Sequence, residues 1–141
     1  MSPHIATVQS IYQAFGSGNI PAILERLSPD VRWEEWADNQ AQRGGVPTLA
    51  ARRGPDEVMA FFQAVGSLQL HNLEVLDIVG GERQVVAEVV IDFTVPATGR
   101  RCRDEELHLW TFGGDGKVQR LRHYTDTAKQ LWAHGKGLPQ P

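Results

Sequence analysis

The second half of the chain is a run of apolar strands separated by turn residues, and this run limits the fold more than any other feature. Apolar segments extend over about 70–79, 84–95, 102–112 and 117–125. Residues rich in glycine and proline separate them, and the clearest such turn is Gly113-Gly114-Asp115-Gly116. Strands joined by such short turns pair with their neighbours. The pattern therefore predicts a four-stranded meander.

The first half of the chain has the spacing of helices. Apolar residues from Ile5 to Phe15 recur every three or four positions, which is typical of one helix face. Asn19 is a suitable cap for a second, short helix, which Ser28-Pro29-Asp30 ends. A third helix is expected from Pro55 to Gly66, and a last one follows the strands and ends at Gly135.

One strand and one long loop are expected between these helices. Residues 31–36 alternate in polarity, so a strand there places Val31, Trp33 and Glu35 on one face. Residues 37–53 show no period and contain Gly44-Gly45. A loop of this length in a compact domain is usually functional or mobile, which makes it a candidate lid over a binding site.

Length and composition favour a single domain. We expect residues 1–135 to form one α+β domain and residues 136–141 a C-terminal tail, since the 141-residue chain fits one core. The net charge of -3 and the scattered basic residues argue against a nucleic-acid partner. The sequence shows neither a membrane-spanning segment nor a secretory signal, so we expect a cytoplasmic protein.

The last hairpin brings ionisable residues to one face of the sheet. If Phe112 lies opposite Lys117, then Glu106 lies opposite His123 and His108 lies diagonal to it. Two histidines and a glutamate among aromatic residues are suited to acid–base chemistry, because histidine titrates near neutral pH. A purely structural role for both histidines is the alternative.

The other face of this hairpin is also partly apolar, with Leu107, Leu109, Val118 and Tyr124. Helices can cover only one face of a sheet in a chain of this size. The second face is therefore expected to pack on another subunit, most simply in a two-fold homodimer.

Three segments in this order resemble one superfamily of proteins. They are VQSIYQAFGSGNIPAILERLSPDVRWEE, RRGPDEVMAFF and ELHLWTFGGDGKVQRLRHYTD. The chain resembles the SnoaL-like and ketosteroid-isomerase-like proteins of the nuclear transport factor 2-like superfamily. The resemblance implies a cystatin-like fold, in which a cone-shaped, curved mixed β-sheet wraps around helices and encloses a single pocket.

The resemblance also suggests roles for individual residues. Glu35 looks like the position of the isomerase's general-base aspartate, His108 like the oxyanion donor, and His123 like the base of the cyclases. Asp92 is similar in position to an aspartate of the limonene-epoxide hydrolases, and it either faces the pocket or pairs with an arginine. Ile11 stands where the isomerase has its oxyanion tyrosine, which argues against true steroid isomerase activity.

We therefore expect an isomerase or cyclase rather than a hydrolase, acting by proton abstraction next to a carbonyl of a small apolar substrate. The catalytic candidates are Glu35, His108 and His123, with either Glu35 or His123 as the base. The expected substrate contacts are Tyr12, Trp33, Phe62, Asp92, Glu106 and Trp110. No cofactor or metal is expected. A non-catalytic ligand-binding domain and a protein-interaction module are the alternatives.

Overall fold

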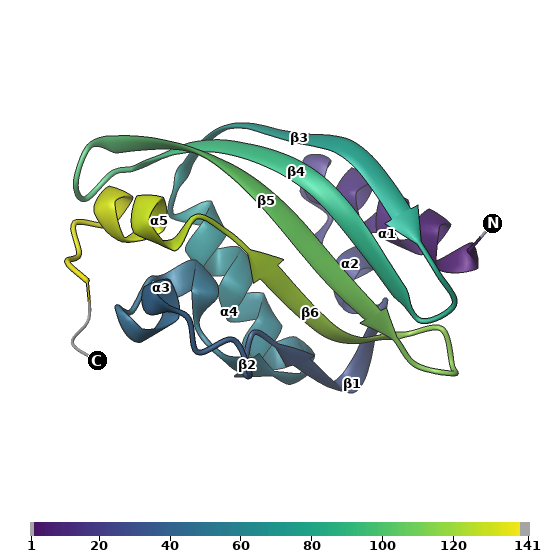
Figure 1. Cartoon of the computed structure of the whole chain (residues 1–141). Coiled ribbons are helices and arrows are strands. Elements are labelled where there is room, and N and C mark those ends of the chain that lie inside the picture. The colour runs from purple at the N-terminus through teal and green to yellow at the C-terminus, as the bar shows by residue number, and fades with distance from the viewer. Residues whose placement is uncertain (1, 139–141) are drawn as a thin grey trace.

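The computed structural model of the chain describes residues 2–138, in which a long, curved sheet packs against helices (Figure 1). The helices are α1 (Pro3–Gly16), α2 (Ile20–Leu24), α3 (Gln40–Arg43), α4 (Gly54–Gly66) and α5 (Thr127–Ala133), with a 3-10 turn, η1 (Pro47–Leu49). The strands are β1 (Leu27–Trp33), β2 (Arg52–Arg53), β3 (Gln69–Gly80), β4 (Gln84–Val95), β5 (Arg100–Phe112) and β6 (Val118–Tyr124). The predicted α+β class is confirmed.

The sheet has six strands in the order β2-β1-β6-β5-β4-β3. β3 to β6 form the predicted antiparallel meander, whereas β1 runs parallel to β6 and makes the sheet mixed. α1, α2 and α4 lie on one side of this sheet (Figure 1). Their apolar faces and the inner face of the sheet share one core, in which Trp33, Trp110 and Leu121 are buried.

β1 differs from its prediction at both ends. It begins at Leu27, which was expected in the second helix, and it ends at Trp33 rather than at Trp36. Pro29 lies where the pairing of β1 with β6 is irregular, and such positions tolerate a residue that has no backbone N–H. The early end of β1 matters for the site, because the two residues after Trp33 are glutamates.

The predicted register of the β5–β6 hairpin is wrong by two residues. Phe112 pairs with Val118, and a bulge beside this pair leaves Gln119 as an extra residue. His108 consequently lies directly opposite His123 rather than diagonal to it. A slip of two residues keeps every side chain on its face, so the shared inner face remains. Val118, beyond the bulge, was expected on the outer face and is instead in the core.

The segment predicted as a long loop folds into α3, η1 and β2. Ala41, Val46 and Leu49 are buried together with Leu131 of α5, so this segment has a small core of its own. The expectation that residues 37–53 form one long loop without secondary structure is therefore wrong. The sequence signal was weak because elements of two to four residues show no periodicity.

Residues 139–141, the last part of the expected C-terminal tail, lie outside the described residues. None of the helices in residues 2–138 is long and apolar enough to span a membrane.

Candidate functional site

A cavity lies between the helices and the inner face of the sheet. Most of its wall is aromatic or aliphatic. The polar side chains in the wall are Tyr12, Thr48, Glu106, His108, His123 and Gln130. A mostly apolar cavity with a few convergent polar groups is the usual form of a small-molecule site.

Seven of the nine residues predicted for the site line this cavity. They are Tyr12, Trp33, Phe62, Glu106, His108, Trp110 and His123. They come from α1, β1, α4, β5 and β6 and so from most of the chain. The two exceptions are Glu35 and Asp92.

Glu35 does not lie in the cavity, and its prediction as a pocket residue is wrong. Its carboxylate forms ion pairs with Arg32 and with Arg53, the latter at 2.9 Å from Nη2 to Oε1. Hydrogen bonds from Arg32 and Arg53 hold the pKa of Glu35 below its usual value. The cause is the preceding residue: Glu34 has a φ of 66°, so the alternation of the strand stops before Glu35.

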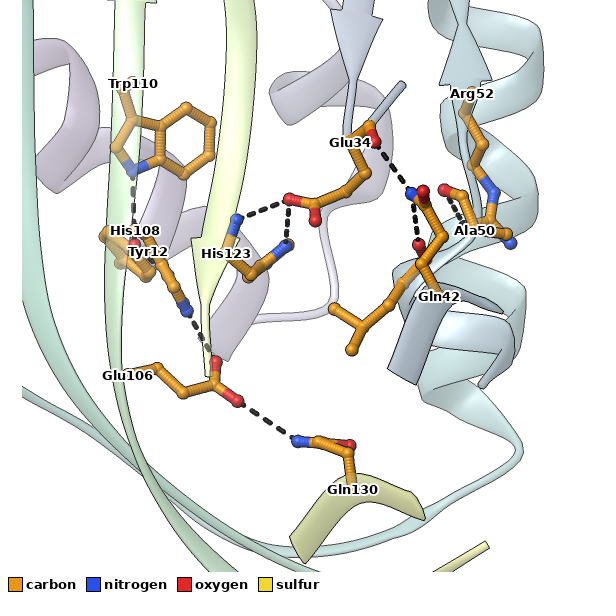
Figure 2. A network of polar contacts seen from close by, with 11 residues as sticks. Tyr12, Glu34, Gln42, Ala50, Arg52, Glu106, His108, Trp110, His123 and Gln130 are labelled. Carbon is orange, nitrogen blue, oxygen red and sulfur yellow. Dashed lines mark hydrogen bonds and ion pairs between the residues drawn. The ribbon is translucent and has the colours of Figure 1, made fainter. Parts of the chain in front are cut away.

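The left-handed backbone conformation of Glu34 directs the side chain of Glu34, rather than that of Glu35, into the interior, where it is 0% exposed. Glu34 was expected to be solvated. Its Oε1 accepts hydrogen bonds from the backbone N–H of His123 and from Nδ1 of the same residue, the latter at 3.1 Å (Figure 2). One carboxylate oxygen therefore fixes both the main chain and the ring of His123.

Three backbone contacts hold Glu34 in its unusual conformation. Its N–H donates to the carbonyl of Leu121 at 3.1 Å, and its carbonyl accepts from Nε2 of Gln42 at 2.8 Å and from the N–H of Ala37 at 3.0 Å. Nε2 of Gln42 also donates to the carbonyl of Leu49 at 3.0 Å. Surroundings that determine a backbone conformation so fully are what allow a strained residue to persist.

A second set of hydrogen bonds lies beside the first on the same face of the sheet, because His108 pairs with His123 across β5 and β6. Nδ1 of His108 lies 2.5 Å from the hydroxyl of Tyr12, and its Nε2 lies 2.8 Å from Oε1 of Glu106. Nε1 of Trp110 donates to the Tyr12 oxygen at 3.3 Å. Nε2 of Gln130, on α5, donates to Oε2 of Glu106 at 3.3 Å (Figure 2). Both ring nitrogens of His108 are thus occupied.

This set of hydrogen bonds continues from Gln130 to Asp104, which is 0% exposed. Its Oδ2 accepts from Nε2 of Gln130 at 3.0 Å, and its Oδ1 accepts from the N–H of Asp126 at 3.2 Å. Burial and the neighbouring carboxyl group of Glu106 raise the pKa of Asp104 to about 7. Burial also raises the pKa of Glu106.

The two histidines have opposite shifts although their ring centroids are only 4.5 Å apart. Burial and the nearby charge of His123 hold the pKa of His108 well below its usual value. Burial alone also lowers the pKa of His123, but the Glu34 carboxylate outweighs this effect and the pKa of His123 is raised. His108 is consequently a neutral ring, and His123 is the one that gains a proton.

Asp92, the other exception, takes the second of its two predicted roles. Its carboxylate receives two hydrogen bonds of 2.9 Å from Arg101. Both neighbours of Asp92 in β4, Ile91 and Phe93, line the cavity, so alternation directs Asp92 to the other face. The hydrogen bonds from Arg101 lower the pKa of Asp92.

Sequence reasoning missed three residues of the site: Glu34, Asp104 and Gln130. A positive φ at a glutamate has no sequence signal, because glutamate rarely takes that conformation. Gln130 enters the wall only because α5 folds back over the end of the sheet, which periodicity does not reveal. Asp104 was within reach, since it lies on the same face of β5 as Glu106 and His108.

The polar groups of the site are suited to moving protons, because histidine titrates near neutral pH. Among residues 2–138, no three His, Cys, Asp or Glu side chains form a group that could hold a metal ion. Nδ1 of His123 faces Glu34, while its Nε2 has no hydrogen-bond partner among those residues. A molecule in the cavity can therefore meet, on one wall, Nε2 of His123, which carries a lone pair when the ring is neutral, and beside it the Tyr12–His108 pair.

Comparisons with known proteins agree with this architecture. A sequence model described as the SnoaL-like domain matches residues 8–121, whereas no curated protein matches. An NTF2-like protein of unknown function from Burkholderia pseudomallei is 25% identical, with a TM-score of 0.77 over 94% of this chain and 98% of that one.

Two other solved structures contain bound molecules. TerC, co-crystallised with polyporic acid, is 21% identical, with a TM-score of 0.75 over 96% of this chain and 100% of that one. A Mycobacterium tuberculosis protein in complex with estradiol-17β-hemisuccinate is 14% identical, with a TM-score of 0.71 over 92% of this chain and 98% of that one. At these identities the likeness shows the fold alone.

Proposed function

The chain belongs to the family of SnoaL-like domains, and on that premise we propose that it is an acid–base enzyme acting on a small, largely apolar carbonyl compound. Abstraction of a proton from the carbon next to the carbonyl gives an enolate, which then leads to isomerisation or to aldol-type cyclisation. His123 is the base in this proposal. The position of Glu35 outside the cavity and its two arginine partners support His123 over Glu35, the other candidate.

The observation that carries the proposal is the arrangement of His123. Glu34 accepts the hydrogen on Nδ1, which leaves the lone pair on Nε2, the nitrogen without a protein partner. The buried carboxylate also stabilises the imidazolium that forms when Nε2 takes a proton, and this raises the basicity of the ring. A carboxylate that orients a histidine and stabilises its charged form is a recurrent device for general-base catalysis.

The same wall supplies, beside His123, a hydrogen-bond donor to the developing enolate oxygen. His108 was expected to donate directly, but its two nitrogens already contact Tyr12 and Glu106. The Tyr12–His108 pair as a unit is therefore the donor that we propose. A donor aimed at developing charge in a site that excludes water contributes far more than it would in solution.

The apolar wall indicates what else the substrate carries. Trp33, Phe61 and Phe62 contact one another and form an aromatic side of the cavity. The M. tuberculosis complex, in which a protein of the same fold holds a steroid ester, supports a ring compound as the ligand. We propose a cyclic ketone of modest size.

Proton exchange tests this proposal. A panel of cyclic ketones is incubated with the protein in deuterated water, and deuterium incorporation next to the carbonyl is followed by NMR. Exchange above the buffer rate is expected with the wild-type chain and should be lost in His123→Ala. The matched control is His71→Ala, an exposed histidine outside the cavity, which should exchange at the wild-type rate. Absence of exchange with every ketone would refute the enzyme.

Ligand binding without chemistry is the second candidate, since most of the cavity wall consists of apolar side chains that take no part in proton transfer. In that case ketones or phenols raise the unfolding temperature but no deuterium enters them. His123→Ala would then change only the affinity.

We further propose that the protein is a cytoplasmic homodimer. The outer face of the sheet exposes Val79, Leu107 and Tyr124, with exposed fractions of 58%, 46% and 45%. Analytical ultracentrifugation should give twice the mass of the chain, and Leu107→Glu should give a monomer. A monomeric wild-type protein at micromolar concentration would contradict this proposal.

A further inference from the structure

Hydrogen bonds connect Glu106 to Tyr12 through His108, and such a chain can hold its protons in two ways. In the first arrangement Glu106 is ionised, so Nε2–H of His108 donates to it. Nδ1 then carries a lone pair and accepts the only proton of the Tyr12 hydroxyl. In this arrangement Tyr12 has nothing left to donate to a molecule in the cavity.

The second arrangement reverses both bonds. Glu106 is a carboxylic acid and donates from Oε1 to Nε2 of His108. Nδ1–H then donates to the Tyr12 oxygen, which already accepts Nε1–H of Trp110. The two lone pairs of the oxygen are thus occupied, and the hydroxyl proton of Tyr12 is free to point into the cavity.

The surroundings of Glu106 favour the second arrangement. Its own strand contributes Asp104 and His108, β6 contributes His123, the end of β1 contributes Glu34, and α5 contributes the neutral Gln130. Among residues 2–138, Glu106 forms no ion pair with a lysine or arginine. Burial, the largest effect, and the charge of Glu34 raise the pKa of Glu106, and they outweigh the charge of His123 and the hydrogen bond with Asp104, which lower it. A side chain only 7% exposed is therefore stabilised by keeping its proton.

Gln130 also decides which oxygen of Glu106 carries that proton. Its amide N–H groups point to Oε2 of Glu106 and to Oδ2 of Asp104, so Oε2 is an acceptor. Oε1 is left to face Nε2 of His108 as a hydroxyl. The ring of His108, which burial keeps neutral, has the same charge in both arrangements, so only the position of its proton distinguishes them.

We infer that Glu106 is a positioning residue, which through His108 turns the Tyr12 hydroxyl into the hydrogen-bond donor for an acceptor oxygen of the bound molecule. The role of Tyr12 in catalysis rests on the proposed function. The direction of the hydrogen bonds from Glu106 through His108 to Tyr12 does not rest on the proposed function, because it is a property of the protein without ligand. The inference also narrows the ligand class: its oxygen must accept, as a carbonyl or phenolate oxygen does.

The tautomer of His108 tests the inference. The ring nitrogens of uniformly ¹⁵N-labelled protein are observed at pH 7 by long-range ¹H–¹⁵N NMR, and His108→Asn assigns the signals. We expect Nδ1 to be protonated and Nε2 to be bare. A His108 ring with the proton on Nε2 would overturn the inference. At a pH well above the raised pKa of His123, where that ring is neutral, its Nδ1–H held by Glu34 serves as an internal reference for the Nδ1–H pattern.

Two variants sharpen the measurement. In Glu106→Gln, the Gln130 amide selects the oxygen of the new side chain, so its NH₂ group faces Nε2 of His108 and fixes the Nδ1–H tautomer at every pH. Glu105→Gln is the matched control, because Glu105 is adjacent but 79% exposed as a side chain, and it should leave the tautomer as in the wild type.

The wild-type spectrum alone decides the inference if Glu106→Gln does not fold. Failure of the ketones to exchange deuterium would refute the proposed enzyme and leave the tautomer result intact. An Nε2–H tautomer together with active exchange would refute the positioning role and leave the base, His123, in place.

Discussion

His108 and His123 lie opposite each other on β5 and β6, and each contacts one glutamate, yet the two pairs differ in what they can do. Glu34 reaches His123 from the end of a third strand, whereas Glu106 reaches His108 from two residues away on the same strand. One histidine has a raised pKa and the other a lowered one. Identical residue types therefore have different protonation states at a ring separation of 4.5 Å.

The difference comes from the number of donors and acceptors around each carboxyl group. Oε1 of Glu34 receives two N–H donors from His123 alone. Glu106 shares the Gln130 amide with Asp104, so two acidic groups compete for one donor group. The comparison teaches that neighbours, rather than the Glu–His pairing itself, assign the acid and the base.

Removal of the Glu34 charge should have the largest effect. In Glu34→Gln, the imidazolium of His123 loses its counter-charge, and general-base contributions are about 10²- to 10⁴-fold. We expect deuterium exchange of a reactive cyclic ketone to fall about 100-fold or more. Exchange rates measured by NMR provide the check. A variant that exchanges at the wild-type rate would remove the distinction between the two pairs.

Asp104→Asn tests the environment of the other pair. The raised pKa means that folded Asp104 binds a proton between its ordinary value of 3.8 and about 7, so its contribution to stability is present at low pH and is lost as pH rises through that window. The free energy of unfolding of the wild type should therefore lose about 2–4 kcal/mol more than that of Asp104→Asn between pH 4 and pH 7. Urea unfolding at several pH values measures this, and parallel curves would contradict it.

The pH dependence of the rate follows from His123. Its raised folded pKa means that the neutral base is populated only above the ordinary value of 6.5, so exchange should rise with pH through a midpoint above 6.5. The rise is about tenfold per pH unit below that midpoint. In Glu34→Gln the midpoint should move to lower pH. A midpoint below 6.5 in the wild type would reverse the roles assigned to the two pairs.

Glu35→Gln should have the smallest effect and serves as the control for Glu34→Gln. Its carboxylate pairs with Arg32 and Arg53 near the surface, where such ion pairs contribute about 0–1 kcal/mol. We expect wild-type exchange and a change in unfolding free energy within about 1 kcal/mol. A loss of exchange in this variant as large as in Glu34→Gln would mean that the effect of removing a glutamate charge does not depend on contact with His123.

Most of the fold follows from the sequence because its signals are local. The spacing of Val8 and Ile11 predicts α1, and the turns around Gly113 predict the meander. Period-two alternation places Glu106, His108 and His123 on one face even though the predicted register was wrong by two residues. Local signals of this kind survive small errors in boundaries.

The pairing of Glu34 with the base, His123, does not follow from the sequence, because it depends on the φ angle of Glu34. Regular alternation after Trp33 selects Glu35, and only the left-handed conformation of Glu34 exchanges the two glutamates. The contacts that hold this conformation come from Leu121 and Gln42, which lie far along the chain or in a segment without period. Tertiary contacts of this kind leave no pattern in the sequence near Glu34.

The left-handed Glu34 also sets stability against function in this chain. A non-glycine residue in that conformation costs of order 1–3 kcal/mol, and Glu34→Gly relieves it by a single substitution. The same change removes the partner of His123. A descendant released from selection for chemistry would therefore relieve this backbone strain by losing the partner of its base, His123, and would keep the cavity as a binding site. At this position, a single substitution would thus lead from an enzyme to a binding protein within one fold and would lower the backbone strain.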